Sequence, residues 1–141
     1  MNIEFEVSGL IPATPQEVFT AWLDSKEHSL MTASPSLVSA VVGETFEAGD
    51  GYIQGRNLEL HPPHRILQSW RTTEFDSTDK DSRLEIMFTP ADTATKVTIR
   101  HSDLPDDGLK YKQGWIDFYF VPMTAYFMEK SNRSSLRKSN L

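Results

Sequence analysis

Hydrophobic and polar residues alternate at the start of the chain and again through its middle. From Asn2 to Leu10 the apolar residues, among them Phe5 and Val7, recur at every second position, which predicts a half-buried strand. Between Leu37 and His101 the same period, broken by turn signals at intervals of roughly eight to twelve residues, predicts a meander of antiparallel strands. The clearest strands of this meander are Tyr52–Leu60, Arg65–Thr73, Arg83–Thr89 and Thr95–His101.

Two short helices are predicted between the first strand and the meander. Thr14 and Glu17 have the spacing of a capping box, and Pro15 suits the first helical position. These residues begin an amphipathic helix that we expect to end near Asp24. A second, weaker helix is predicted over Ser25–Met31.

A long helix dense in aromatic residues is predicted over Leu109–Met128. Pro122 lies inside it, and we expect the proline to kink the helix and to let its second half bend over a cavity mouth. The segment 131–141 has no apolar stripe, so we expect a flexible tail after a single domain over residues 1–130.

The order of these elements predicts the fold class. It is an α+β fold in which a curved antiparallel sheet wraps around a long C-terminal helix, with two short helices after the first strand. Only the long helix is large enough to cover one face of the sheet. The 141 residues, of which 38% are hydrophobic, suffice for one domain with a sizeable core.

Charge and composition exclude several classes of function. A net charge of −6 argues against binding to nucleic acid or to an anionic membrane. The absence of cysteine excludes disulfides and thiolate catalysis. We find no membrane-spanning run, signal peptide, P-loop or dinucleotide fingerprint, and therefore expect a cytoplasmic protein without a metal or cofactor.

Five segments of the chain together resemble a known family. They are FEVSGLIPATPQEVFTAWLDSKEH, GYIQGRNLELHPPHRILQSWRTTEF, RLEIMFTP, KVTIRHSDLP and GWIDFYFVPMTAYF. In this order they are similar to the homologues of the heat-shock-protein ATPase activator, within the START-like, birch-pollen-allergen-like superfamily. The resemblance implies a helix-grip fold with a cavity between the sheet and the long helix. It leaves the function open, because the superfamily includes lipid carriers, hormone receptors, cyclases and co-chaperones.

The strand pair around residues 52–73 carries the best candidate site. We expect Leu58, Leu60 and Ile66 to belong to the core. Strand alternation then directs Arg56, Gln68 and Trp70 inward as well. An inward arginine needs a partner, which is either a carboxylate of the protein or an oxygen of a ligand.

Other cavity residues are predicted from the last strand and the long helix. His101 continues the inner face of its strand and is either a hydrogen-bonded core residue or a cavity-lining group. Trp115 and Tyr119 share a helical stripe that must pack on the sheet, whereas His28 is expected at the surface. The predicted ligand-binding residues are Arg56, Gln68, Trp70, His101, Trp115 and Tyr119.

Three functions fit these residues. The first is binding of a small, largely apolar or aromatic molecule in an internal cavity, by a monomer or a homodimer. The second is a co-chaperone-like role in the stress response, with a chaperone contacted through the outer surface. The third is a cyclase- or hydrolase-like enzyme that uses His101 as an acid–base group. We take the first as the prediction.

Overall fold

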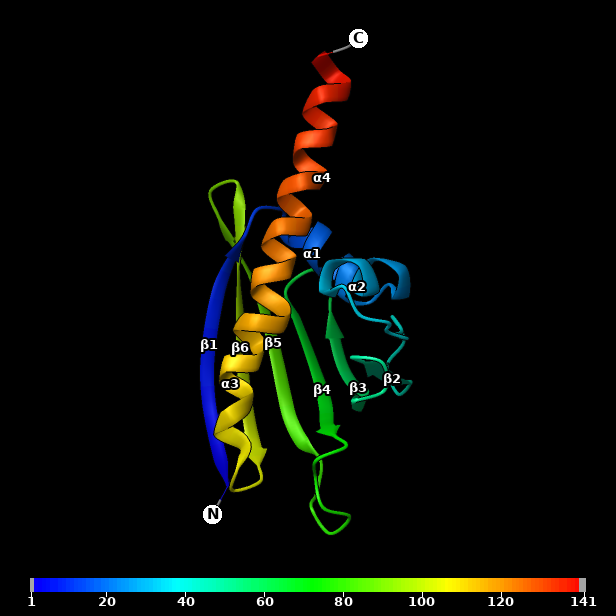
Figure 1. Ribbon diagram of the computed structural model, residues 1–141, viewed down its shortest axis with the longest axis vertical. Helices are drawn as coiled ribbons and strands as arrows, with labels where there is room; N and C mark the ends of the chain where they lie inside the picture. The colour runs from blue at the N-terminus through cyan, green and yellow to red at the C-terminus, as the bar shows by residue number, and fades with distance from the viewer. Residues whose placement is uncertain (1, 140–141) are drawn as a thin grey trace.

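Six antiparallel strands form one curved sheet in the computed structural model, which describes the backbone of residues 2–139 and the side chains of residues 2–133 (Figure 1). The order of strands across the sheet is β1-β6-β5-β4-β3-β2. The strands are β1 (Ile3–Ile11), β2 (Thr45–Ala48), β3 (Ile53–His61), β4 (Arg65–Thr72), β5 (Ser82–Ala91) and β6 (Ala94–Leu104). Each predicted strand is therefore confirmed. The four-residue β2 was not predicted, because alternation cannot be recognised over so short a segment.

The helices lie against one face of this sheet, which confirms the α+β, helix-grip fold (Figure 1). Two short helices, α1 (Pro15–Trp22) and α2 (Ser25–Thr32), follow β1. The turn η1 (Gly108–Lys110) leads into the long helix, which runs without interruption from residue 111 to residue 139. Its parts are α3 (Tyr111–Trp115), the π-helical η2 (Ile116–Phe120) and α4 (Val121–Ser139).

Local sequence explains where the short helices begin. The Thr14 side chain accepts a hydrogen bond from the Glu17 amide at 3.2 Å, and the Glu17 carboxylate accepts one from the Thr14 amide at 3.2 Å. This is the predicted capping box, with Pro15 in the first turn. In the same way the Asp24 carboxylate accepts from the Glu27 amide at 2.9 Å and caps α2.

The long helix extends further than its aromatic pattern. It continues through Pro122, directly after the wider turns of η2, and its backbone remains helical to Ser139. Most of the predicted flexible tail therefore falls within the helical backbone, whereas residues 140 and 141 lie outside the described residues. The domain boundary at residue 130 stays a prediction.

An irregular step in the β3–β4 ladder decides which side chains face inward. Asn57 pairs with Gln68, but the next pair is Glu59 with Leu67, so Leu58 is one extra residue in β3. Leu58 is accordingly 40% exposed instead of buried. The alternation is reset at this bulge, and residues before it lie on the face opposite to the one predicted.

Candidate functional site

A cavity of about 780 Å³ opens between the long helix, the C-terminal end of α2 and the turn that joins β2 to β3. We call it the aromatic groove. Its lining is largely apolar, with polar groups at intervals, and consists of Thr32, Ala33, Ser34, Gly49, Tyr52, Ile53, Trp70, Glu74, Lys110, Tyr111, Gln113, Gly114, Trp115, Asp117, Phe118 and Tyr119. Its volume is in the range of small-molecule sites.

Three aromatic side chains from two elements form the floor of this groove. Trp115 and Tyr119 lie one turn apart on the long helix, with ring centroids separated by 4.8 Å, and Trp70 of β4 lies 5.9 Å from Trp115. All three are buried, whereas Phe118 at the rim is 71% exposed. The groove therefore combines a rigid aromatic floor with an accessible aromatic edge.

Charged and polar groups at one end of the groove bind one another. The Lys110 ammonium lies 3.3 Å from the Glu74 carboxylate and 3.0 Å from that of Asp107. The Tyr52 hydroxyl also donates to Glu74, and the hydrogen bonds from Tyr52 and Lys110 lower the pKa of the Glu74 carboxyl. This end offers an ammonium, a carboxylate and a phenol to a polar group of a ligand.

His101 is fully buried behind the floor and does not line the groove. Its Nδ1 accepts a hydrogen bond from the Trp115 indole at 3.1 Å, so Nε2 carries the proton and donates to the Ser82 hydroxyl at 2.9 Å. Burial lowers the pKa of the imidazole to about 3. Both nitrogens are occupied by protein groups, which favours the core-histidine interpretation and provides no accessible acid–base group.

The prediction that His28 lies at the surface is wrong. The ring is 2% exposed, with Nδ1 donating to the Trp22 carbonyl at 2.7 Å and Nε2 accepting from the Tyr119 hydroxyl at 2.9 Å. Burial lowers the pKa of His28 to about 4 and raises the pKa of Tyr119. No local pattern could reveal this, because Tyr119 is 91 residues away in the chain. The pair joins α2, one wall of the groove, to the long helix.

The structure brings three of the predicted site residues together in the groove, namely Trp70, Trp115 and Tyr119. Sequence reasoning missed Tyr111 and Phe118, which helical spacing from Trp115 would have placed on neighbouring positions. All the groove-lining residues of the long helix precede Pro122. The prediction that the second half of this helix bends over the cavity mouth is therefore wrong.

Two other predicted residues lie away from the groove. Gln68 is buried, and its amide donates to Asn57 Oδ1 at 2.9 Å. Arg56 is opposite Ser69 in the ladder, whereas Gly55 is opposite Trp70, so Arg56 and Trp70 lie on opposite faces of the sheet. The predicted placement of Arg56 beside Trp70 is wrong, because the bulge at Leu58 reverses the alternation that was counted from Leu60.

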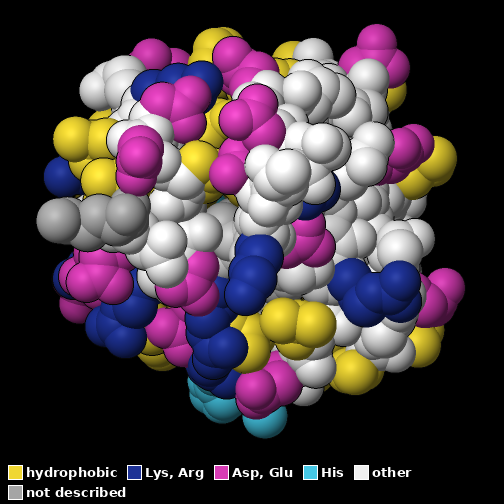
Figure 2. Space-filling view, turned by 90° about the horizontal axis from the view of Figure 1, so that it is seen from below, with side chains coloured by type: hydrophobic (Ala, Val, Ile, Leu, Met, Phe, Trp, Pro, Cys, Tyr) yellow, Lys and Arg dark blue, Asp and Glu magenta, His cyan; other side chains and the backbone are white. Residues whose placement is uncertain are grey.

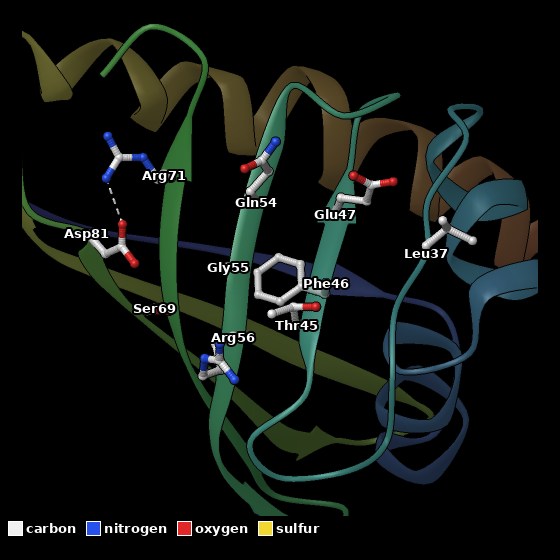
Figure 3. Close-up of a pocket in the computed structure, with 10 residues that line it drawn as sticks. All are labelled: Leu37, Thr45, Phe46, Glu47, Gln54, Gly55, Arg56, Ser69, Arg71 and Asp81. Carbon is white, nitrogen blue, oxygen red and sulfur yellow. Dashed lines mark hydrogen bonds and ion pairs between the residues drawn. The ribbon is translucent and has the colours of Figure 1, made fainter. Parts of the chain in front are cut away.

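Arg56 lines a second cavity, of about 550 Å³, on the outer face of β2, β3 and β4 (Figure 3). We call it the outer hollow. In Figure 3 the Arg56, Gln54 and Glu47 side chains project from this face. The lining residues are Leu37, Thr45, Phe46, Glu47, Gln54, Gly55, Arg56, Ser69, Arg71 and Asp81.

One end of the molecule shows no extended surface of a single charge. The view from below shows acidic and basic side chains interspersed over that end of the molecule (Figure 2). Within the described part of the chain, no helix has the length and apolar character needed to cross a membrane. Among the same residues, no group of three histidine or carboxylate side chains is arranged to hold a metal ion.

Comparisons with known proteins agree with this architecture. The family model described as "Activator of Hsp90 ATPase homolog 1-like protein" matches residues 12–127. A search of curated protein sequences finds no match.

Three solved structures illustrate the likeness. An HSP90 activator from Plasmodium falciparum has a TM-score of 0.73 and 23% identity, over 84% of this chain and 91% of that one. The Aha1 dimer from Colwellia psychrerythraea has a TM-score of 0.70 and 16% identity, over 90% and 96%. CalU16 from Micromonospora echinospora has a TM-score of 0.69 and 20% identity, over 92% and 82%. At these identities the likeness shows the fold alone.

Proposed function

We propose that this chain, which belongs to the Activator of Hsp90 ATPase homolog 1-like family, binds a small, largely apolar or aromatic molecule in the aromatic groove. The observation that carries the proposal is the groove's composition: a floor of Trp70, Trp115 and Tyr119 and an exposed Phe118 around a volume of about 780 Å³. A concave, mostly apolar site with a few polar groups is the usual form of a small-molecule pocket.

The polar end of the groove sets the orientation of such a ligand. A ring system placed over the aromatic floor that buries about 200 Å² of apolar surface gains roughly 5 kcal/mol before the costs of association. A hydroxyl or carbonyl group at its end then reaches Glu74 or Lys110, which already hold defined positions through their own bonds. The ligand class that fits is a flat, mostly apolar molecule with one terminal polar group.

The test uses Gly114, which lines the groove from the long helix. A Cβ atom at this position would meet only the Phe118 ring, at 3.8 Å, so alanine fits without a clash. Leucine would project further and occupy the groove. We expect the neutral fluorophore N-phenyl-1-naphthylamine to bind the wild type and Gly114→Ala alike, and Gly114→Leu at least about tenfold more weakly.

Fluorescence titration measures these affinities, and thermal unfolding shows whether each variant is folded. A folded Gly114→Leu variant that binds the fluorophore as tightly as Gly114→Ala does would refute the groove as the binding site. If the groove is the binding site, mass spectrometry can identify the natural ligand class as a molecule that co-purifies with the wild type and is absent from Gly114→Leu.

Chaperone contact through the outer surface is the second candidate function. It is favoured by the family description and by the Plasmodium falciparum structure, which is described as an HSP90 activator. Such contact would not depend on an open groove. Stimulation of a chaperone ATPase that is equal for wild type and Gly114→Leu would support this function in place of the first.

We also propose that a homodimer is the oligomeric state to test. The Colwellia psychrerythraea relative is described as a dimer. Sedimentation velocity over a range of concentrations would show whether the mass of this chain rises above 16.0 kDa.

A further inference from the structure

Six arginines have described side chains, and four of them form ion pairs with carboxylates. Those four are Arg65, Arg71, Arg100 and Arg133. Arg56 and Arg83, both exposed, form none with any described residue. On a chain with a net charge of −6, two arginines without a carboxylate partner require an explanation.

The sheet register brings these two arginines to the same place. Arg56 of β3 is opposite Ser69 of β4, and Ser69 is opposite Arg83 of β5. All three lie on the outer face, because their neighbours Trp70 and Leu84 are buried on the inner one. Directly opposite residues have Cβ atoms about 5 Å apart, so two guanidinium groups flank one hydroxyl.

This arrangement continues across five strands. Thr45 of β2 is opposite Arg56, and Ser102 of β6 is opposite Arg83, so hydroxyl and guanidinium groups alternate across the sheet. We call these five residues, Thr45, Arg56, Ser69, Arg83 and Ser102, the arginine–serine row.

Three residues of this row, Thr45, Arg56 and Ser69, line the outer hollow. The Arg56 guanidinium donates to the Gly43 carbonyl, which fixes its position on one side of the hollow. On another side Arg71 is held by the Asp81 carboxylate at 2.8 Å and by the Asp79 carbonyl at 3.1 Å. A group that enters above Ser69 therefore meets the Arg56 guanidinium, which is already held in place (Figure 3).

Nearby charges leave the row positive. The Asp81 carboxylate is paired with Arg71, and the Glu85 carboxylate is paired with Arg65 and Arg100. Glu47 also lines the outer hollow, but it is opposite Gln54 and not Arg56. The two guanidinium groups beside Ser69 thus have no negative partner within their own row, and an anion between them would relieve their repulsion.

We propose that the arginine–serine row binds the phosphate group of a small molecule over Ser69, between the guanidinium groups of Arg56 and Arg83. Arginine presents a planar fork of N–H donors that matches phosphate oxygens. Donors from two sides and a hydroxyl from below suit a tetrahedral anion better than a planar carboxylate, which one fork already satisfies. The remainder of the molecule would occupy the outer hollow toward Leu37 and Phe46.

The experiment is a titration of the full chain with inorganic phosphate, followed by the backbone amide signals in NMR. Sodium chloride of matched ionic strength is the reference, and sodium acetate is the carboxylate arm. We expect saturable shifts centred on Arg56, Ser69 and Arg83, and weaker binding of acetate. Arg56→Ala and Arg83→Ala should each weaken phosphate binding about tenfold or more.

Arg100→Ala is the matched control, because it removes an exposed arginine from the same face that is already paired with Glu6 and Glu85. We expect its phosphate affinity to stay within about twofold of wild type. Shifts without saturation, binding that survives both Arg56→Ala and Arg83→Ala, or an equal loss in Arg100→Ala would each overturn the site. Acetate that binds as tightly as phosphate would overturn the choice of phosphate.

The phosphate site and the aromatic groove can be tested independently, because they lie on opposite faces of the sheet. Arg56→Ala should bind N-phenyl-1-naphthylamine as the wild type does, and Gly114→Leu should bind phosphate as the wild type does.

Discussion

Strands β3 and β4 present different chemistry on their two faces. On the inner face the Trp70 ring lies 4.4 Å from that of His101 and 5.9 Å from that of Trp115. Every buried side-chain nitrogen and oxygen among the described residues has a hydrogen-bond partner. On the outer face, Arg56 and Ser69 belong to an exposed row of charged and hydroxyl groups around a hollow.

The difference separates groups that hold the fold together from groups that remain available. The inner polar groups find their partners within the protein, so they stabilise and orient the aromatic floor. Arg56 has no carboxylate partner among the described residues, and its charge is available to a molecule from solution. On the outer face, the feature that points to a site is a charged group without a carboxylate partner, and not polarity alone.

Gly55 of β3 lies opposite Trp70 of β4, and its substitution should have the largest effect. A Cβ atom at this position would lie 2.0 Å from the Ser69 carbonyl oxygen and 2.6 Å from the Phe46 ring. Because Ser69 O belongs to the backbone of β4, the strands must move apart. We expect Gly55→Ala to lower the free energy of unfolding by more than about 4 kcal/mol, measured by urea denaturation.

Gly114→Ala provides the matched comparison. It is the same substitution at a position with open space, in a helix, where alanine is favoured by up to about 1 kcal/mol. A Gly55→Ala protein as stable as Gly114→Ala would contradict the close contact of β3 with β4 and Phe46.

Acid should destabilise the inner face through its two buried histidines. Burial lowers the pKa of His28 to about 4 and that of His101 to about 3, whereas both have a pKa near 6.5 in the unfolded chain. The unfolded state therefore binds more protons below pH 6.5. The stability that comes from keeping these two imidazoles neutral is present at pH 7 and above, and it is lost as the pH falls toward 4. Between pH 7 and pH 5 the two histidines together should lower the free energy of unfolding by roughly 4 kcal/mol.

Urea denaturation at pH 7, 6 and 5 measures this loss. His28→Gln should reduce the slope of the unfolding free energy against pH by about half, since one of the two buried histidines remains. His64→Gln, at an exposed position, is the control and should leave the slope unchanged. Stability that stays constant from pH 7 to 5 would contradict the burial of both imidazoles.

The fold could be predicted because its signals are local and repeated. Alternation over nine residues predicts β1, and the spacing of Thr14, Pro15 and Glu17 predicts the start of α1. The burial of His28 could not be predicted in the same way. It depends on the Tyr119 hydroxyl, which the sheet and the long helix bring to α2 from a distant part of the chain.

The candidate site could be predicted only in part. Trp70 faces the long helix because the alternation within β4 is regular. Arg56 faces the other way because of the bulge at Leu58. The sequence does not reveal this bulge, because Leu58, Glu59 and Leu60 alternate as they would in a regular strand. One extra residue in a strand reverses every face assignment beyond it.

Trp115→Phe tests whether the inner polar contacts are structural. Phenylalanine keeps an aromatic ring in the groove but removes the N–H group that donates to His101 Nδ1 at 3.1 Å. The buried acceptor is then left without its partner, which should cost about 2 kcal/mol in urea denaturation. Unchanged stability would show that the indole–imidazole hydrogen bond contributes nothing to the fold.

Deletion of Leu58 should have the smallest effect, although it removes a residue from the middle of a strand. Asn57 pairs with Gln68 and Glu59 with Leu67, so removal of Leu58 makes these two pairs consecutive and leaves every other partner in place. The side chain is 40% exposed, and little apolar burial is lost. We expect a change within about 1 kcal/mol in urea denaturation, with fluorophore and phosphate binding retained.

Asn57→Ala is the companion variant that shows why the extra residue is Leu58 and not its neighbour. The buried Asn57 amide donates to the carbonyls of Ser39 at 2.8 Å and Val41 at 3.1 Å, and its oxygen accepts from Gln68. Alanine removes all three bonds, leaves the Ser39 carbonyl and the Gln68 amide without these partners, and leaves the Val41 carbonyl with the Glu44 amide alone, which should cost about 3 kcal/mol. If deletion of Leu58 costs as much as Asn57→Ala, or abolishes binding on either face, the bulge is not what separates the two chemistries.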